Sequence, residues 1–248
     1  MRNSRAGIVF QPYLGAVRGF PDTRISVVAA LSSYDIPERS RATETVLAAY
    51  RTPVIAVLER RWNMQPADAE DMAHDFFAHA LDRDWLARYD PAKGRFRIFL
   101  RTCLLGFAST AHEAATRQKR GGGATHVSLD DAGAIATDEE TTSIFDREWI
   151  RSVLSMSLNA LEQECLARGR DAAWRVFVAY DVEGADGERP TYETLAHDAG
   201  IPVTQVTNYL NSTRRLFREH VLTTLRSLTA SDAEYRDEVR ALLGSTAI

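Results

Sequence analysis

The carboxylates and imidazoles between positions 71 and 79 are the residues of this chain whose types best suit metal chemistry. His74 and Asp75 are adjacent, Asp71 lies one helical turn before them, and His79 and His112 follow. Imidazole and carboxylate groups bind divalent metals in hydrolases. His74 and His79, however, are five positions apart and point to different faces of a helix, and no second His/Asp pair follows. The sequence therefore argues against an enzyme and predicts no catalytic residue, metal ligand or cofactor.

The same segment instead indicates a helix with an acidic surface. Pro66 suits the first position of a helix, and Asp68 in the first turn opposes the positive end of the helix dipole. Asp71, His74 and Asp75 then share one face, while apolar residues recur at helical spacing on another. Two interpretations stay open at this point: a solvated surface and a surface for a protein partner.

A run of arginines and aromatic residues follows a turn at positions 90–94. Arg95, Arg97 and Arg101 are expected on the outside of a helix whose buried face carries Phe96, Phe99, Leu100, Cys103, Leu104 and Phe107. Arginine beside aromatic rings suits single-stranded nucleic acid, because guanidinium groups pair with phosphates and ring faces stack on unstacked bases. The alternative is a set of core aromatics with solvated arginines.

Residues 191–218 fit a helix-turn-helix pattern. Leu195 and Ala196 supply apolar contacts on the first helix, Gly200 suits the turn, and Val206 and Leu210 anchor the second helix inward. The outward residues of the second helix suit base edges and phosphates, and they are Thr204, Gln205, Thr207, Asn208 and Asn211. Arginines that suit phosphates continue the helix at Arg214, Arg215 and Arg218. A helical bundle without a DNA role is the alternative.

Composition limits the class of protein. The chain has 248 residues, of which 45% are hydrophobic and 26% are charged, so it suits one or two globular domains. No apolar run approaches the roughly 18 residues that span a membrane, and we expect a cytoplasmic protein without membrane insertion. Cys103 and Cys165 lack metal-ligand spacing and are expected as buried free thiols. A net charge of −4 argues against nonspecific coating of nucleic acid.

The helical periods predict an all-α chain of two helical domains joined by a flexible acidic linker. An arm over residues 1–38 precedes a domain over 39–120, in which Pro53 should kink or split the first helix. Three glycines open a linker over 121–143, where helical periodicity is lost. A second domain covers 144–230, and a capping box that begins at Ser231 opens a last helix in 231–248.

The stretch DAEDMAHDFFAHALDRDWLARYDPAKGRFRIFL, followed by QKRGGG and SLDD, resembles region two of bacterial sigma factors of the extracytoplasmic-function group. The branch most similar is common in planctomycetes and myxobacteria, and FPDTRISVV near the N-terminus is similar to a segment of that branch. The resemblance spans about residues 20–243 and makes the helix-turn-helix a region-four equivalent. It implies a sigma factor that directs core RNA polymerase to promoters for transcription initiation, with catalysis left to the polymerase.

The resemblance also assigns roles to residues and names partners. It implies contacts with the clamp of the largest polymerase subunit by Asp71, His74, Asp75, Phe76 and Phe77, although relatives usually carry glutamine at position 74. It implies minus-ten recognition and strand opening by Arg95, Arg97, Phe99, Arg101, Arg117, Lys119 and Arg120. It implies that the helix-turn-helix reads the minus-thirty-five element of promoter DNA beside the flap of the second-largest subunit. An anti-sigma factor as a further partner stays open.

One departure from the family pattern supports an alternative function. Relatives place several basic or large polar groups in the helix equivalent to residues 105–116, whereas this chain has small residues there, among them Gly106, Ala108, Ala111 and Ala114. The alternative is a sigma-like DNA-binding regulator, or an interaction protein, that does not itself open promoters.

Overall fold

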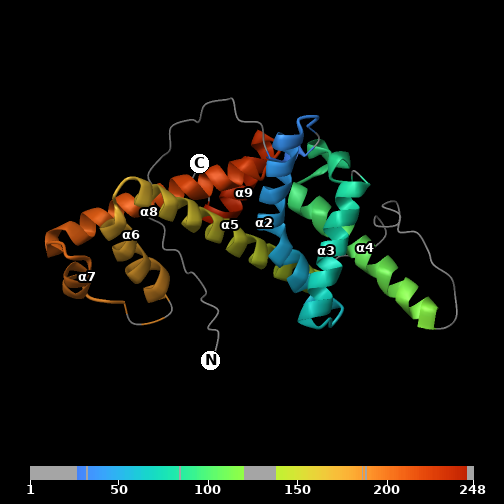
Figure 1. Ribbon diagram of the computed structural model, residues 1–248, viewed down its shortest axis with the longest axis horizontal. Helices are drawn as coiled ribbons and strands as arrows, with labels where there is room; N and C mark the ends of the chain where they lie inside the picture. Colours follow the sequence, from blue (N-terminus) through green and yellow to red (C-terminus); the bar gives the residue numbers. More distant parts are fainter. Residues whose placement is uncertain are drawn as a thin grey trace. The chain divides into compact units, whose positions relative to one another are not determined.

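The computed structural model describes residues 27–31, 33–83, 85–119, 138–185, 187 and 189–244, and this part of the chain is helical without a β-strand (Figure 1). The all-α expectation is therefore confirmed. The α-helices are α1 Val27–Ala30, α2 Ile36–Arg61, α3 Pro66–Asp82, α4 Phe96–Lys119, α5 Glu139–Ala167, α6 Asp171–Phe177, α7 Tyr192–Ala199, α8 Val203–Ser227 and α9 Asp232–Leu243. Short turns of 3₁₀- or π-helix are η1 Leu86–Arg88, η2 Pro91–Lys93, η4 Val178–Val182 and η5 Glu183–Ala185.

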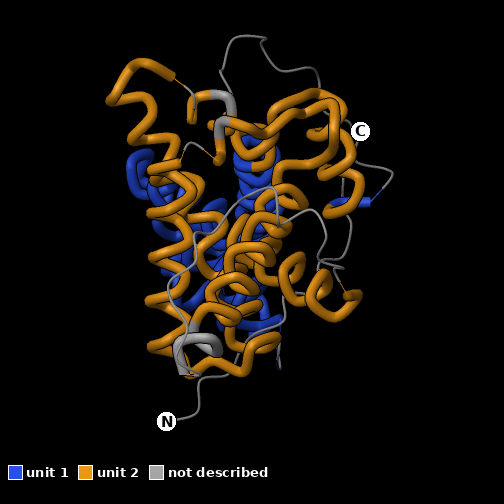
Figure 2. Tube along the Cα trace, turned by 90° about the vertical axis from the view of Figure 1, so that its right-hand side faces the viewer, with its two compact units in different colours: residues 1–17, 154–224, 243–248 blue, residues 18–153, 225–242 orange. Residues whose placement is uncertain are grey.

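The chain divides into two compact units (Figure 2). Among the described residues, those within 154–224 and 243–244 fall in the first, called here the helix-turn-helix unit, and those within 27–153 and 225–242 fall in the second, the α2–α4 unit. The breaks between these units fall inside α5 and α8, and the domain bounds taken from the sequence stay a prediction. The last five residues of the predicted linker are helical, since α5 begins at Glu139. Residues 1–26 and 120–137 lie outside the described residues.

The first two long helices begin where local signals favour a start. The Asp35 carboxylate accepts a hydrogen bond from the Glu38 amide, which satisfies one of the free donors at the start of α2. α3 begins at Pro66, as predicted, because a first-turn residue needs no amide donor. Pro53 lies inside α2, but the helix continues to Arg61, so the expected split does not occur.

A tight turn then sets the start of α4. The Asp90 carboxylate accepts a hydrogen bond from the Ala92 amide at 3.0 Å, which stabilises η2. Gly94 follows with a φ of +144°, a backbone angle that favours glycine. These two residues bring Arg95 and the first turn of α4 back onto the helices that precede them.

Aromatic rings form much of the core of the α2–α4 unit. Tyr50 of α2 is almost fully buried, and its ring centroid lies 5.6 Å from that of Phe96, 6.3 Å from that of Phe145 and 6.4 Å from that of Trp149. Edge-to-face and offset contacts of this kind stabilise a core beyond the area they bury. Helices α2, α4 and α5 are therefore held together around one tyrosine.

The helix-turn-helix unit has its own apolar cluster. Its buried members come from α6, α7 and α8, and they are Val176, Leu195, Ala196, Val206 and Leu210. The π-helical turn after α6 adds Tyr180, which packs edge-on against Tyr192 with ring centroids 5.6 Å apart. This cluster fixes the first turns of α8, and so determines which of its residues face outward.

Candidate nucleic-acid and partner-binding surfaces

The acidic surface expected on α3 is present. Asp71, His74 and Asp75 are all exposed on this helix. Phe76 and Phe77, which the family resemblance placed in the same contact, are instead buried at 0% and 5% exposure. Their rings contact one another, and the ring of Phe76 lies 5.7 Å from that of Phe107 in α4. The two phenylalanines therefore belong to the core, and only the polar residues of the predicted set face solvent.

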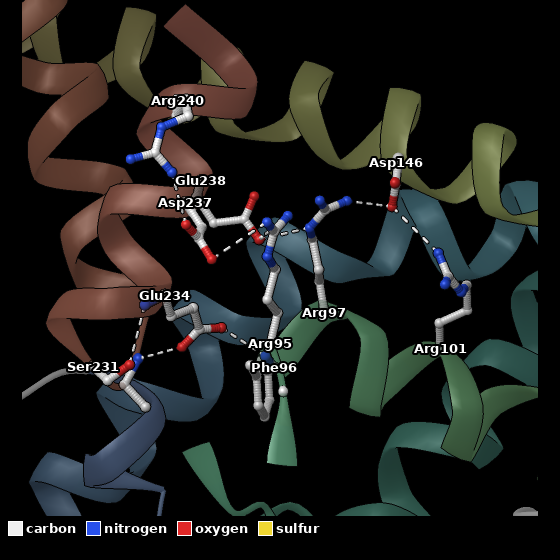
Figure 3. A network of polar contacts seen from close by, with 12 residues as sticks. Arg95, Phe96, Arg97, Arg101, Asp146, Ser231, Glu234, Asp237, Glu238 and Arg240 are labelled. Carbon is white, nitrogen blue, oxygen red and sulfur yellow. Dashed lines mark hydrogen bonds and ion pairs between the residues drawn. The ribbon is translucent and has the colours of Figure 1, made fainter. Parts of the chain in front are cut away.

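The arginines at the start of α4 differ most from expectation, because two of them are buried. Arg97 is 9% exposed and Arg101 is 7% exposed. Nε of Arg97 donates to Oε1 of Glu238 at 2.7 Å, and its Nη1 lies 2.5 Å from Oδ1 of Asp146 (Figure 3). Nη1 of Arg101 lies 3.4 Å from that same carboxylate oxygen. The prediction that these side chains lie outside was wrong, since carboxylates from α5 and α9 make their burial tolerable.

Aromatic faces complete the surroundings of these arginines. The guanidinium of Arg97 lies 5.2 Å from the ring centroid of Trp149, and that of Arg101 lies 6.0 Å from that of Phe145. Both rings belong to α5, and cations are attracted to the faces of aromatic rings. The arginine and aromatic pairing that suggested single-stranded nucleic acid is thus satisfied within the protein.

Burial and ion pairing act on these groups in opposite directions. Burial lowers the pKa of Arg97, but Glu238 and Asp146 outweigh it, so the pKa is raised overall. Burial lowers the pKa of Arg101, which Asp146 only partly offsets. Burial raises the pKa of Glu238, against the lowering effect of Arg97 and Arg95. Arg97 is therefore the charge that keeps a carboxylate tolerable at the buried position 238.

The remaining residues of the predicted strand-opening set are distributed unevenly. Arg95 is half-buried, with Nη2 3.6 Å from Asp237 and Nη1 3.7 Å from Glu238. Phe99 is also half-buried, and its ring lies 5.5 Å from that of Tyr89. Arg117 and Lys119 belong to the C-terminal part of α4, while Arg120 lies outside the described residues.

Glu234 joins α9 to the start of α4. Its amide donates to the Ser231 hydroxyl at 3.2 Å, which is the hydroxyl arm of the predicted capping box. Its carboxylate accepts from the Ala230 amide at 2.8 Å and from the Phe96 amide at 2.6 Å. Half of the box thus forms as expected, and the carboxylate also satisfies a free donor of a second helix. The capping box in the sequence predicted that Glu234 caps α9, but not that its carboxylate accepts from the Phe96 amide. No signal in the sequence predicted that Asp146 and Glu238 pair with Arg97.

The unusual helix at residues 105–116 is core in its first part. Leu105, Gly106, Phe107 and Ala108 are buried, whereas His112 and Glu113 are exposed. Glycine at position 106 and alanine at position 108 fit that burial. The part of this segment that lacks the family's basic groups at positions 105–108 is therefore a packed helix face.

The helix-turn-helix has the expected local geometry. The Thr191 hydroxyl accepts from the Thr194 amide at 3.2 Å and caps α7. Gly200 ends that helix in the left-handed region, with φ of 67° and ψ of 38°. The Ile201 amide then donates to the Ala196 carbonyl at 3.0 Å, and α8 begins at Val203. A short turn with one glycine thus connects the two helices, as predicted.

The outward face of α8 is as the sequence predicted. Val206 and Leu210 are 0% and 1% exposed, whereas the whole polar set is exposed: Thr204, Gln205, Thr207, Asn208 and Asn211. These short side chains carry donors and acceptors of the kind that read base edges in a major groove. The face presents hydrogen-bonding groups on a helix whose opposite side is fixed in the core.

The arginines that continue α8 are not equally accessible. Nε and Nη2 of Arg214 donate to the Asp181 carboxylate at 2.8 Å and 2.9 Å, and its guanidinium lies 5.7 Å from the Tyr180 ring centroid. The bonds to Asp181 raise the pKa of Arg214, with burial acting against them. Arg215 is exposed and Arg218 is half-buried. Arg214 therefore holds α8 against the π-helical turn that carries Asp181. Arg215 is the most accessible of the three predicted phosphate contacts.

Two further observations concern the described residues as a whole. They contain no group of three His, Cys, Asp or Glu side chains placed to hold a metal ion. None of their helices combines the length and apolar character needed to cross a membrane.

No family model, curated protein or solved structure is significantly similar to this chain.

Proposed function

We propose that this chain is a sigma-type transcription initiation factor, which binds core RNA polymerase and directs it to promoters. The observation that carries this proposal is the exposed polar face of α8, held outward by a helix-turn-helix with a left-handed glycine in its turn. A helix presented in this way is suited to the major groove of DNA. Catalysis of RNA synthesis belongs to the polymerase in this proposal.

The α3 surface supports the polymerase half of the proposal. Asp71, His74 and Asp75 project from a helix whose opposite side is locked by Phe76 and Phe77. A rigid helix with an exposed charged face suits a protein partner, because little conformational entropy is lost when it binds. The motif resemblance at residues 68–100 points to the clamp of the polymerase's largest subunit as that partner.

One observation favours a second function, a DNA-binding regulator that does not open promoters. Arg97 and Arg101, which strand opening would require, are buried and paired with Asp146 and Glu238. A protein that remained in this state would present only its α8 face to DNA. Transcription therefore separates the two functions, since both bind DNA but only the first yields transcripts.

Run-off transcription with purified core polymerase and a genomic promoter library tests the proposal. We expect specific transcripts with the native chain and their loss in Asp71→Arg/Asp75→Arg, because the charge reversal repels a basic partner surface. Glu44→Arg/Glu183→Arg is the matched control, since both residues are exposed and the change in charge is equal. The control should retain the transcripts.

Two results would count against a sigma factor. Loss of transcripts in both variants would mean that charge in general, and not the α3 surface, is responsible. Absence of transcripts with the native chain, together with sequence-selective binding of duplex DNA that Asn208→Ala weakens, would favour the regulator. A typical base contact contributes about 1–3 kcal/mol of discrimination, so that loss should be about fivefold or more.

A further inference from the structure

Helix α9 places three acidic side chains at the start of α4. Glu238 and Glu234 are 2% and 6% exposed, and Asp237 lies beside them near Arg95 (Figure 3). At the start of α4, these acidic residues contact Arg95, Arg97 and the backbone amide of Phe96. Arginine side chains and free amides at a helix start are also the groups that bind phosphates.

We propose that α9 is an intramolecular competitor of single-stranded DNA for Arg95 and Arg97. Its carboxylates occupy the positions at which DNA phosphates would pair, so the described structure is a masked state. This inference rests on the proposed function, which makes the Arg95–Arg101 segment a nucleic-acid contact. It adds a regulatory role for the C-terminal helix.

The position of α9 in the chain suits such a role. It follows α8 after a connection of four residues, and the guanidinium of Arg226, in the last turn of α8, pairs with Asp232 at the start of α9. The contacts of α9 with Arg95 are long, at 3.6 Å and 3.7 Å, and the Asp237 side chain is 48% exposed. The Arg95–Asp237 pair is thus both long and solvated, and because such pairs contribute little to stability, a polyanion can replace it readily.

Arg97 has a second partner that α9 does not supply. Asp146 of α5 contacts it at 2.5 Å and holds it near the Trp149 ring. Neutralising the carboxylates of α9 should therefore leave Arg97 in place while removing one of the two carboxylates that compete with phosphate for it. We therefore expect the fold to survive this substitution.

Fluorescence anisotropy with a fluorescein-labelled oligothymidylate and the purified full chain tests the competition. We expect Asp237→Asn/Glu238→Gln to bind the strand more tightly. Each newly available guanidinium adds one phosphate contact, which steepens the slope of log K against log salt by about 0.7 and increases affinity about fivefold near 0.1 M salt. Two contacts give a change in slope of about 1.4.

Control variants separate unmasking from a general change in charge. Glu44→Gln/Asp82→Asn makes the same change in net charge at exposed positions of the α2–α4 unit, and its slope should match that of the native chain. Arg95→Gln added to the double variant should remove about half of the gain. Asp237→Asn alone alters a partly exposed residue, and it should give a smaller gain with unchanged circular dichroism.

The outcomes are decisive. An unchanged salt slope in a folded Asp237→Asn/Glu238→Gln chain, or an equal gain in the charge control, would overturn the inference. If the double variant unfolds, the single variant decides by the same slope criterion. Because this binding is measured without polymerase, a gain in slope without run-off transcripts would support masking and reject the sigma function. Run-off transcripts without a gain in slope would support the sigma function and reject masking.

Discussion

Replacing Arg97 with methionine tests how the buried charges of the α2–α4 unit are balanced. Methionine retains much of the apolar stem of arginine but removes the guanidinium that contacts Glu238 at 2.7 Å. Glu238 is 2% exposed and, among the residues that the structure describes, would keep Arg95, at 3.7 Å, as its cationic neighbour. Removal of one partner from a buried ion pair destabilises proteins by about 3–5 kcal/mol.

Protonation of Glu238 sets an upper limit on that loss. An unperturbed glutamate has a pKa of about 4.3, so neutralising it costs about 4.4 kcal/mol at pH 7.5 and about 1 kcal/mol at pH 5. In the variant the folded-state pKa of Glu238 rises further, because the cation that lowered it is gone. A raised folded-state pKa gives stability that is fully present below the unfolded value and is lost as the pH rises through the folded value. We therefore expect a deficit of about 3 kcal/mol at pH 7.5 that shrinks to about 1 kcal/mol at pH 5.

Urea unfolding followed by tryptophan fluorescence measures this deficit. Trp62, Trp85 and Trp149 belong to the α2–α4 unit, and the last lies beside Arg97. Glu238→Gln in the Arg97→Met background should restore part of the stability at pH 7.5 and abolish the difference between pH 5 and pH 7.5. A deficit below about 1 kcal/mol at pH 7.5, or one that is equal at both pH values, would refute the explanation that the variant leaves the Glu238 carboxylate buried without its ion-pair partner.

Three further predictions follow from single residues. Burial raises the pKa of the Cys103 thiol to about 12, so in native protein near pH 8 it should react with Ellman's reagent far more slowly than in urea; equal rates would show that the thiol is accessible. Gly200→Ala should destabilise the helix-turn-helix unit by about 1–2 kcal/mol, because φ at this position is +67°. A methyl group there would have open space around it, so the loss comes from the backbone angle and not from a clash. Gly200→Asn should lose less stability than Gly200→Ala on thermal unfolding. Leu210→Ala should lose about 2–5 kcal/mol, since Leu210 is 1% exposed, and the fluorescence of Trp174 measures this loss.

Local signals in the sequence predicted the helices and several of their ends. Pro66 starts α3, Gly94 takes a positive φ before α4, and Gly200 ends α7 in the left-handed region. Each of these features depends on the backbone preferences of one residue and its immediate neighbours, so each is visible without the fold. The orientation of α8 was predictable for a related reason, because a 3.6-residue period places Val206 and Leu210 on the same side.

The sequence by itself thus determined an all-α chain, the acidic side of α3 and the polar side of α8. Only the tertiary structure decided that Arg97 is buried, because its partner Glu238 lies 141 positions later in the chain. Charge favours an exposed position for any lone arginine, and that preference reverses only when another helix brings a carboxylate to it. Helical periodicity specifies which residues share a face, but the helix that covers that face is chosen by packing across the whole unit.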